Sequence, residues 1–564
     1  MRRLIIAVIV LLAAPLLAQA QKASLADLIQ AGNRKAALDS IRTGGADVNQ
    51  PQPDGTRPIH WAVYKVDYEL IDALIAKKAK VDVTNEFGSA PLAEAVKLAD
   101  ARMVKMLLDA GAGVESANED GQTALMLAIK TAELPIVEML IKAGANVSTV
   151  EKFQDQTPLM WAAAAPKNAA EMVKLLLSKS ADVKPRARYT DWPNQISSEP
   201  RGQYRPVGGL TALLYASRDG CYDCVEALLG AGADVNVPTP EGVTPLMIAL
   251  DNEHNDVANL LLDRGASPHV TDWWGRTALY IAIERKESGG GGRGGGRGAG
   301  AAGGAAGGRG VAATPRGSRP TVSSMDIVNR LLAADVDPDP ELNMHRPSRG
   351  GNSGRFGEEQ KNTGCTPLYL STEAGDMEVV RALLAKGANP NVNDMGFTPF
   401  LVAAGVTPGG RGGGGGTPNT ALLDLMIQHG ADVNAQVTGT RTYSMRISYN
   451  TPPDKEGVSA LHGAVQAGRA DLVRYLLEKG ANPELADANG KKPIDLLDAG
   501  SNSGARGRGG APAPAAAGNA GRGAGAAPAA GAGGRGAAGG GAGAVSPAAA
   551  AEIRAILQDA AAKK

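Results

Sequence analysis

Apolar residues along this chain gather in pairs of short clusters that return about every 33 residues. From Gly242 to Ser267 the sequence reads G-V-T-P-L-M-I-A-L-D-N-E-H-N-D-V-A-N-L-L-L-D-R-G-A-S, with one apolar cluster after Thr244 and a second ending at Leu262. Comparable copies open at Gly55, Gly88, Gly121, Gly209, Gly242 and Gly275. Because a fixed period of this length indicates one supersecondary unit stacked many times, the pattern predicts a solenoid of helix pairs.

Each half of the repeating unit carries its own helix boundary signal. The first half opens on Thr or Ser before Pro or an apolar residue, as in Thr157-Pro158-Leu159. A hydroxyl there can accept a hydrogen bond from a free helix N–H, and Pro is tolerated at the first helical position. The second half ends in L-L-x-x-G-A-D-V-N, as in Leu228 to Asn236, where Gly suits a left-handed helix end.

These two alternating motifs resemble the ankyrin repeat. The resemblance implies an all-α ankyrin-repeat solenoid of helix-turn-helix units with β-hairpin fingers, interrupted here by disordered Gly-rich loops. We count about eleven repeats from Pro53 to the C-terminus, after a capping segment that ends in its own Gly45-Ala46-Asp47-Val48-Asn49. The resemblance also implies that His60 and His462 hydrogen-bond to adjacent repeats.

The order of these features predicts the domain organisation. The expected segments are a signal peptide at 1–20, N-terminal capping helices at 21–52, repeats one to four at 53–186, a finger insertion at 187–207, repeats five to seven (first part) at 208–287, a Gly/Arg-rich disordered insertion at 288–320, repeats seven (second part) to nine at 321–406 with a loop at 337–363, a Gly-rich insertion at 407–418, repeats nine to eleven at 419–500, a Gly/Ala/Pro-rich disordered insertion at 501–546 and a C-terminal capping helix at 547–564.

The Gly-rich insertions fall between the first and second helix of a repeat, after which the second helix resumes in register. The first of them, 288–320, carries five Arg and no acidic residue and is similar to the Arg/Gly-rich segments of RNA-binding proteins. It contains no Phe, Tyr or Trp on which bases could stack. We therefore expect weakly basic spacers and no nucleic-acid partner.

Insertions of a second kind fall between repeats, at the fingers, and are rich in Tyr, Trp and Arg. Because these side chains are enriched at binding hot spots, the finger side is the expected recognition surface. The candidate partner-binding residues are Tyr189, Trp192, Tyr204, Trp273, Trp274, Arg355, Phe356, Arg441, Tyr443 and Tyr449. Trp273 and Trp274 could instead pack on neighbouring fingers. Phe87 lies at a similar tip, whereas Trp61 and Trp161 are expected to pack within the first helices.

Cys221 and Cys224 form a C-x-x-C at the start of the second helix of repeat five. The register predicts a buried, apolar position for Cys224, so the simplest interpretation is two small hydrophobic side chains. A local disulfide or redox pair is the main alternative, because a helix N-terminus can activate a thiol. A metal site is the third, although a single C-x-x-C supplies only half of a zinc site.

The N-terminus has the pattern of an export signal. Arg2 and Arg3 precede an apolar run that ends at Leu17, followed by Ala18-Gln19-Ala20. The run is shorter than a bilayer span requires, so cleavage is expected rather than an uncleaved anchor. We expect an exported protein, periplasmic or secreted, that is not inserted in the membrane after cleavage and is a monomer.

Composition and motifs point away from catalysis. Aromatic residues make up 4% of the chain and its formal net charge is zero, which suits thin helix pairs with no general attraction for polyanions. No phosphate-binding loop, zinc helix or nucleophile elbow is present. We therefore expect no enzyme, cofactor or metal, and a scaffold that binds a partner protein. The alternatives are an envelope spacer that contacts cell-wall polymer through the Gly/Arg-rich insertions, or a redox-responsive protein centred on the C-x-x-C.

Overall fold

The structure is a computed structural model that describes residues 23–190, 207–272, 275–289, 321–340, 365–393, 396–407, 419–438, 455–499 and 545–563. Its contacts divide the chain into two units. Unit 1 comprises Met1–Trp273 and Arg293–Ile327, and unit 2 comprises Trp274–Gly292 and Val328–Lys564.

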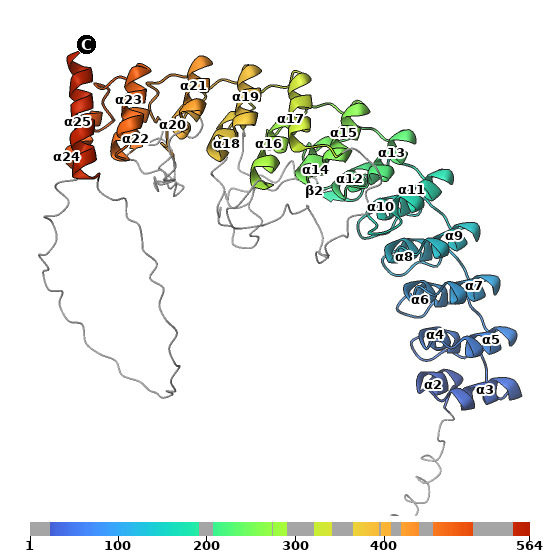
Figure 1. Cartoon of the computed structure of the whole chain (residues 1–564). Helices are drawn as coiled ribbons and strands as arrows, with labels where there is room; N and C mark the ends of the chain where they lie inside the picture. The colour runs from blue at the N-terminus through green and yellow to red at the C-terminus, as the bar shows by residue number, and fades with distance from the viewer. Residues whose placement is uncertain are drawn as a thin grey trace, which may run out of the picture. The chain divides into compact units, whose positions relative to one another are not determined.

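Unit 1 is built from helices that follow one another as pairs (Figure 1). They are α2 (Leu25–Gln30), α3 (Arg34–Thr43), α4 (Pro58–Tyr64), α5 (Tyr68–Ala76), α6 (Pro91–Lys97), α7 (Ala101–Asp109), α8 (Ala124–Thr131), α9 (Leu134–Lys142), α10 (Pro158–Ala163), α11 (Ala169–Ser178), α12 (Ala212–Arg218), α13 (Tyr222–Gly230), α14 (Pro245–Asp251) and α15 (Asn255–Asp263). Helix α17 (Ser324–Ala333) begins in unit 1 and ends in unit 2.

Unit 2 repeats the same arrangement. Its elements are α16 (Ala278–Gly289), α18 (Pro367–Ala374), α19 (Met377–Ala385), α20 (Pro399–Ala403), α21 (Thr420–Gln428), α22 (Ala460–Gln466), α23 (Ala470–Glu478), the 3₁₀ turn η3 (Pro493–Asp495), α24 (Leu496–Ala499) and α25 (Pro547–Ala562). Within each unit a first helix packs on its own second helix and on the first helix of the next pair, as α4 does on α5 and α6. The predicted all-α solenoid of helix pairs is confirmed.

The first helices begin where the sequence predicts them, because a Thr hydroxyl accepts from the third helical N–H. Thr157 Oγ1 accepts from Met160 N at 3.3 Å, and Thr244, Thr366 and Thr398 cap their helices in the same way. Three second helices, α5, α7 and α19, are capped by an aspartate at the equivalent point, such as Asp100, whose Oδ1 accepts from Met103 N at 2.9 Å. Helices α9, α11, α15 and α23 have no side-chain cap there.

The D-V-N motif has a packing role that its spacing does not reveal. Asn236 Oδ1 accepts from Ser267 N at 2.7 Å while its Nδ2 donates to Gly265 O at 3.4 Å in the next repeat. Equivalent pairs of hydrogen bonds are made by Asn49, Asn391 and Asn434. Each Asn therefore fastens the end of one second helix to the end of the next.

The fingers carry less β structure than the expected hairpins. In the described part of the chain the named strands are β1 (Tyr189–Thr190) and β2 (Val207–Gly208), which pair antiparallel with Tyr189 opposite Gly208. Isolated bridges join Ala117 to Thr123 and Gln436 to Ser459. Most fingers are too short for a ladder, so they close as tight turns, such as that between Asn85 N and Ser89 O at 3.1 Å.

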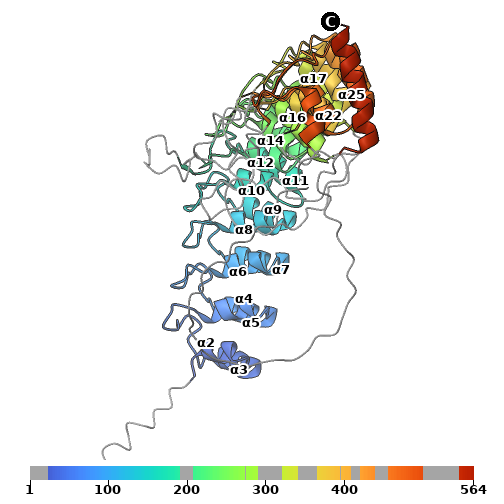
Figure 2. The same cartoon turned by 90° about the vertical axis from the view of Figure 1, so that its left-hand side faces the viewer.

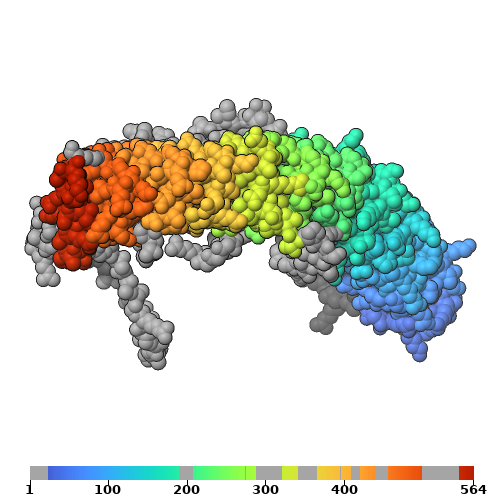
Figure 3. Space-filling model, turned by 45° about the horizontal axis from the view of Figure 1, so that its top comes forward, coloured from blue at the N-terminus to red at the C-terminus, as the bar shows by residue number. Residues whose placement is uncertain are grey.

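The core is a thin apolar layer between the two helices of each pair. Helix α7 buries Met103, Val104 and Leu107, and the corresponding residues of α25 are Ile553 and Leu557. Within each unit the colours follow chain order in bands, as expected when each pair packs on its sequence neighbours (Figure 3). No helix among the described residues is long and apolar enough to cross a membrane.

Candidate protein-binding surface

Phe87 lies at the tip of a finger in unit 1 and is 69% exposed. Asn85 builds the turn, because its Oδ1 accepts from Phe87 N at 3.1 Å and from Ser89 N at 2.9 Å. Its Nδ2 donates to Thr56 Oγ1 of the preceding finger at 3.1 Å. The exposed phenyl ring is thus carried on a turn whose polar groups are already paired.

Phe153 occupies the same tip position two repeats further along and is 67% exposed. Here the turn is organised by Glu151, which is only 2% exposed. Glu151 Oε2 accepts from Phe153 N at 2.7 Å, and Oε1 accepts from Gln154 N at 2.7 Å and from Gln156 N at 3.0 Å. In this longer turn a buried carboxylate accepts the backbone N–H groups. In the turn of Phe87 an amide side chain has the same role.

Tyr189, in β1, is 52% exposed and is flanked by anchored arginines. Arg188 makes a bidentate ion pair with Asp155, at 2.9 Å and 3.0 Å, which raises the pKa of the guanidinium. Arg186 Nη1 donates to Pro238 O at 2.7 Å in the following finger. Gly208, opposite Tyr189, has φ +92°, and a Cβ there would lie 2.4 Å from Arg188 O, so only glycine fits.

Backbone hydrogen bonds link successive fingers of unit 1. Glu86 N donates to Asp54 O at 2.9 Å, Lys152 N to Asp120 O at 2.7 Å, and Arg188 N to Gln154 O at 2.6 Å. In Figure 2 the loops between the first helix pairs project from one side of the stack. We call Phe87, Phe153 and Tyr189 the finger-tip aromatics. The finger of Phe87 is thus bonded to the finger before it, and the fingers of Phe153 and Tyr189 are bonded to each other.

A second row of aromatic side chains lies on the first helices of unit 1. Trp61 is half-buried, contacts the ring of Tyr64 edge to face at 5.8 Å, and donates from Nε1 to Gln52 Oε1 at 2.7 Å. Tyr64 itself is 61% exposed. Tyr215 is half-buried and accepts from Gln156 Nε2 at 2.6 Å, and its burial raises the pKa of its hydroxyl.

Cations accompany this second row. Lys65 Nζ lies 5.8 Å from the centre of the Tyr64 ring, Lys130 Nζ lies 5.8 Å from that of Trp161, and the Arg218 guanidinium lies 4.9 Å from that of Tyr215. Such pairs contribute about 0.5–1 kcal/mol at exposed sites. The first helices thus present aromatic rings with positive charge beside them.

The structure places one of the ten predicted partner-binding residues. Tyr189 is exposed on a finger, whereas Trp192, Tyr204, Trp273, Trp274, Arg355, Phe356, Arg441, Tyr443 and Tyr449 lie outside the described residues. Trp61 and Trp161 are half-buried in first helices, where packing was expected. Phe153 and Tyr64 were missed. Phe153 lies two full 33-residue repeats after Phe87, so the period of the sequence could have identified it.

The two histidines tie adjacent repeats, as the family resemblance implied. His60 Nδ1 accepts from Arg57 N at 3.1 Å and its Nε2 lies 3.1 Å from Ser89 O in the next repeat. His462 makes the equivalent contacts with Ser459 N at 3.2 Å and Lys491 O at 3.0 Å. Burial lowers the pKa of both imidazoles, which favours their neutral form.

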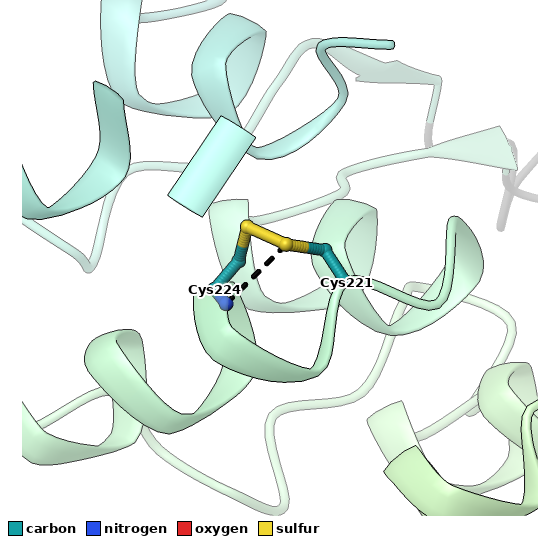
Figure 4. Close-up of a disulfide and its surroundings, with 2 residues drawn as sticks. All are labelled: Cys221 and Cys224. Carbon is teal, nitrogen blue, oxygen red and sulfur yellow. Dashed lines mark hydrogen bonds between the residues drawn. A yellow bond between two sulfur atoms is a disulfide. The ribbon is translucent and has the colours of Figure 1, made fainter. Parts of the chain in front are cut away.

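Cys221 and Cys224 are joined by a disulfide, with their Cα atoms 5.2 Å apart (Figure 4). Cys224 is fully buried, as its register predicts, while Cys221 is partly exposed. Cys365 is buried in unit 2. Within the described ranges no group of three or more His, Cys, Asp or Glu side chains could hold a metal ion.

Comparisons with known proteins agree with this architecture. The sequence profile described as "Ankyrin repeats (3 copies)" matches residues 25–118, 92–187, 195–272 and 213–289, and the profile described as "Ankyrin repeat" matches 363–395 and 456–488. Together these matches span more than half of the chain. They leave the count of about eleven repeats as a prediction.

Curated relatives match part of this chain. A human protein named "Mitochondrial disaggregase" is 32% identical over 193 residues, 34% of this chain and 24% of its own length. "E3 ubiquitin-protein ligase KEG" of Arabidopsis thaliana is 26% identical over 359 residues, 61% of this chain and 18% of its own. "Neurogenic locus notch homolog protein 1" of Mus musculus is 27% identical over 280 residues, 47% of this chain and 8% of its own. The chain therefore spans about a quarter or less of the length of each of these relatives.

Proposed function

The chain belongs to the ankyrin-repeat family, and from that premise we propose that it is an exported, non-catalytic scaffold that binds a partner protein through its fingers and first helices. Ankyrin repeats imply a protein–protein interaction scaffold, and the family is typically non-enzymatic. The observation that carries the proposal for this chain is the exposure of the finger-tip aromatics, at 69%, 67% and 52%.

Exposed aromatic side chains on anchored turns are suited to binding. Phe and Tyr contribute large apolar area, and aromatic anchors dominate the energy of many interfaces. The hydrogen bonds of Asn85, Glu151 and Arg188 already order the turns that carry them. A partner would therefore lose less entropy in ordering the surface it binds, which favours affinity.

Export to the periplasm or beyond is part of the same proposal. It rests on the N-terminal sequence, in which two arginines, an apolar run and Ala18-Gln19-Ala20 follow one another. Expression of the full chain and mass determination of its mature N-terminus in the exported fraction would test it. A chain that keeps Met1 to Ala20 and stays in the cytosol would contradict export.

The binding surface is tested by capture with a matched pair of variants. The finger variant carries Phe87→Ala, Phe153→Ala and Tyr189→Ala. The control variant carries Leu98→Ala, which also removes an exposed apolar side chain, at 44% exposure, but from the C-terminal end of α6 and not from a finger. We expect a protein captured by the parent chain and by the control to be lost by the finger variant.

The captured protein is then titrated against all three chains. Loss of hot-spot side chains is expected to weaken binding by at least tenfold, which corresponds to about 1.4 kcal/mol. An equal Kd for the parent and the finger variant would place the binding surface elsewhere. The same titration can be extended to Trp192, Trp273, Trp274 and Tyr443, which remain candidates.

A second candidate function is an envelope spacer that contacts cell-wall polymer through the Gly/Arg-rich insertions. It is favoured by the position of the insertions, since described helices flank each of them within one repeat, as α24 and α25 flank residues 500–544. Deleting the insertions should then abolish association with isolated cell-wall polymer while leaving capture of a protein partner unchanged. Unchanged association with the polymer after the deletion would rule out the spacer function.

A further inference from the structure

Cys221 stands at a position where three of the other second helices carry a capping aspartate. Asp67, Asp100 and Asp376 occupy the residue before α5, α7 and α19, and each accepts a backbone N–H of its helix. Before α13 that acceptor is Cys221 Sγ, which receives the N–H of Cys224 at 3.3 Å. Cys221 thus takes the place of the aspartate cap that α5, α7 and α19 use.

Cys224 replaces an apolar residue in the same way. Three residues after the cap, α5 carries Leu70, α7 carries Met103 and α19 carries Val379, all buried. An aspartate and an aliphatic residue therefore suffice to start and pack this helix elsewhere in the chain. A requirement for a stable helix start does not explain why both positions are cysteine.

The disulfide also contributes little to the stability of the fold. It joins residues only three positions apart. The chain entropy that a cross-link removes from the unfolded state rises with the length of the closed loop, so this bond constrains very little. Its contribution to the stability of the solenoid is correspondingly small.

The two sulfurs differ in access. Cys224 is fully buried on the inner face of α13, whereas Cys221 is partly exposed at the turn after Gly220 (Figure 4). The turn is held by its neighbour, because the His254 ring packs against Gly220 and its Nε2 lies 3.0 Å from Arg218 O. The positive end of α13 points at Cys221, which favours a thiolate at that sulfur.

We propose that Cys221 and Cys224 form a redox-active dithiol–disulfide site that exchanges with thiols of cysteine-containing proteins, with Cys221 as the sulfur that forms the mixed disulfide. A partner thiolate bonds to Cys221 Sγ, and the electron pair of the broken S–S bond moves to Cys224 Sγ, which takes a proton from water. A second partner thiolate then attacks the partner sulfur of the mixed disulfide and releases Cys221 as a thiolate. The site is reduced by two electrons and the partner gains one disulfide.

This activity goes beyond the proposed scaffold function, since a scaffold needs no exchangeable sulfur. The disulfide and the finger-tip aromatics both lie in unit 1.

The asymmetry of the two sulfurs is tested with single-cysteine variants of the full mature chain. Both Cys221→Ser and Cys224→Ser lack the disulfide and so control for its loss, and Cys365→Ala in both removes the third thiol. The probe is 5,5′-dithiobis(2-nitrobenzoic acid), followed by release of its coloured thiolate. We expect Cys221 in the Cys224→Ser chain to react at least tenfold faster than Cys224 in the Cys221→Ser chain, while both keep the parent's circular dichroism. Equal rates would overturn the assignment of Cys221.

Exchange in the parent chain is tested in glutathione buffers of graded composition. The oxidised fraction is read by alkylation and mass spectrometry, and folding by circular dichroism on the same samples. We expect the disulfide to be reduced and reoxidised reversibly while the helical signal stays constant. Reduction that occurs only when the helical signal is lost would show that the disulfide is purely structural. That result would overturn the redox proposal and would leave the scaffold function unaffected.

Discussion

At the scale of single residues, the chain uses different side chains for the same structural task. Asn85 and Glu151 each accept the backbone N–H groups of a finger turn, one with an amide and one with a buried carboxylate. Cys221 and Asp100 each accept at the start of a second helix. A comparison of residue types alone misses this equivalence, because the repeats share a hydrogen-bond acceptor at a given position and not one amino acid.

The buried His462 makes stability depend on pH. Burial lowers the pKa of the folded imidazole below its ordinary value of 6.5, so the unfolded chain binds a proton more readily. The stability it contributes is therefore fully present above about pH 6.5 and is lost as the pH falls through the folded pKa. We expect the urea midpoint of the parent to fall between pH 7.5 and 5.5, and the fall to be smaller in His462→Gln.

The comparison needs both chains at both pH values, because the His462→Gln substitution also changes the hydrogen bonds to Ser459 and Lys491. The readout is the difference between the two midpoints for each chain. A parent and a variant that lose the same amount on acidification would show that other groups, such as the carboxyls near His462, determine the pH dependence.

At the scale of the element, the turn between the two helices of a pair requires one residue with positive φ. Glycine supplies it at Gly220 and Gly375, with φ of 72° and 76°, whereas the first repeat of unit 1 uses Val66 with φ 56°. A β-branched side chain in this region costs roughly 1–2 kcal/mol. Val66 is also 42% exposed, so it gains little by packing.

We expect Val66→Gly to stabilise unit 1 by up to about 1 kcal/mol, since relief of strain exceeds the added entropy of a glycine in the unfolded chain. Gly375→Val is the converse test in unit 2. A Cβ added at Gly375 would meet no other atom within 4 Å, so the loss of about 1–2 kcal/mol would come from the backbone alone. The urea midpoint of each variant measures the change in stability. Shifts of the same sign in the two variants would contradict the role given to backbone strain.

At the scale of the whole molecule, each helix pair is stabilised by its sequence neighbours within a unit, so an insertion inside one pair need not disturb the rest. The last pair of unit 2 shows this. Helix α25 begins after residues 500–544 with Ser546 as its cap, packs on α23, and pairs Glu552 with Arg474 at 2.5 Å.

Replacing residues 500–544 by about five residues should therefore preserve α25. Loop-closure entropy falls with the logarithm of loop length, so a roughly ninefold shortening should stabilise unit 2 by at most about 2 kcal/mol. Thermal unfolding followed by circular dichroism measures the change. A marked loss of helical signal or of melting temperature would show that the insertion contributes contacts to the fold.

Much of this protein could be predicted from its sequence because the information is local and repeated. The starts of the first helices follow from Thr and Ser caps, helix ends from Gly, and the helix-pair solenoid from the period. The histidine contacts also followed, through the family resemblance. The binding surface was harder to predict, because the exposure of a side chain depends on how the neighbouring fingers pack against it.

The repeat, the starts of the first helices, the places where the Gly-rich insertions interrupt a pair and the cysteine spacing are each encoded within a short stretch of chain. They could therefore be predicted from the amino acids alone. Which side chains remain in solvent, and which join different repeats, became visible in the folded chain. Asn236 bonds to Gly265 and Ser267, Glu151 is buried under its own finger, and Cys221 is accessible while Cys224 is not. These outcomes depend on how one repeat is placed against the next, and that placement is a property of packing between repeats rather than of any single motif.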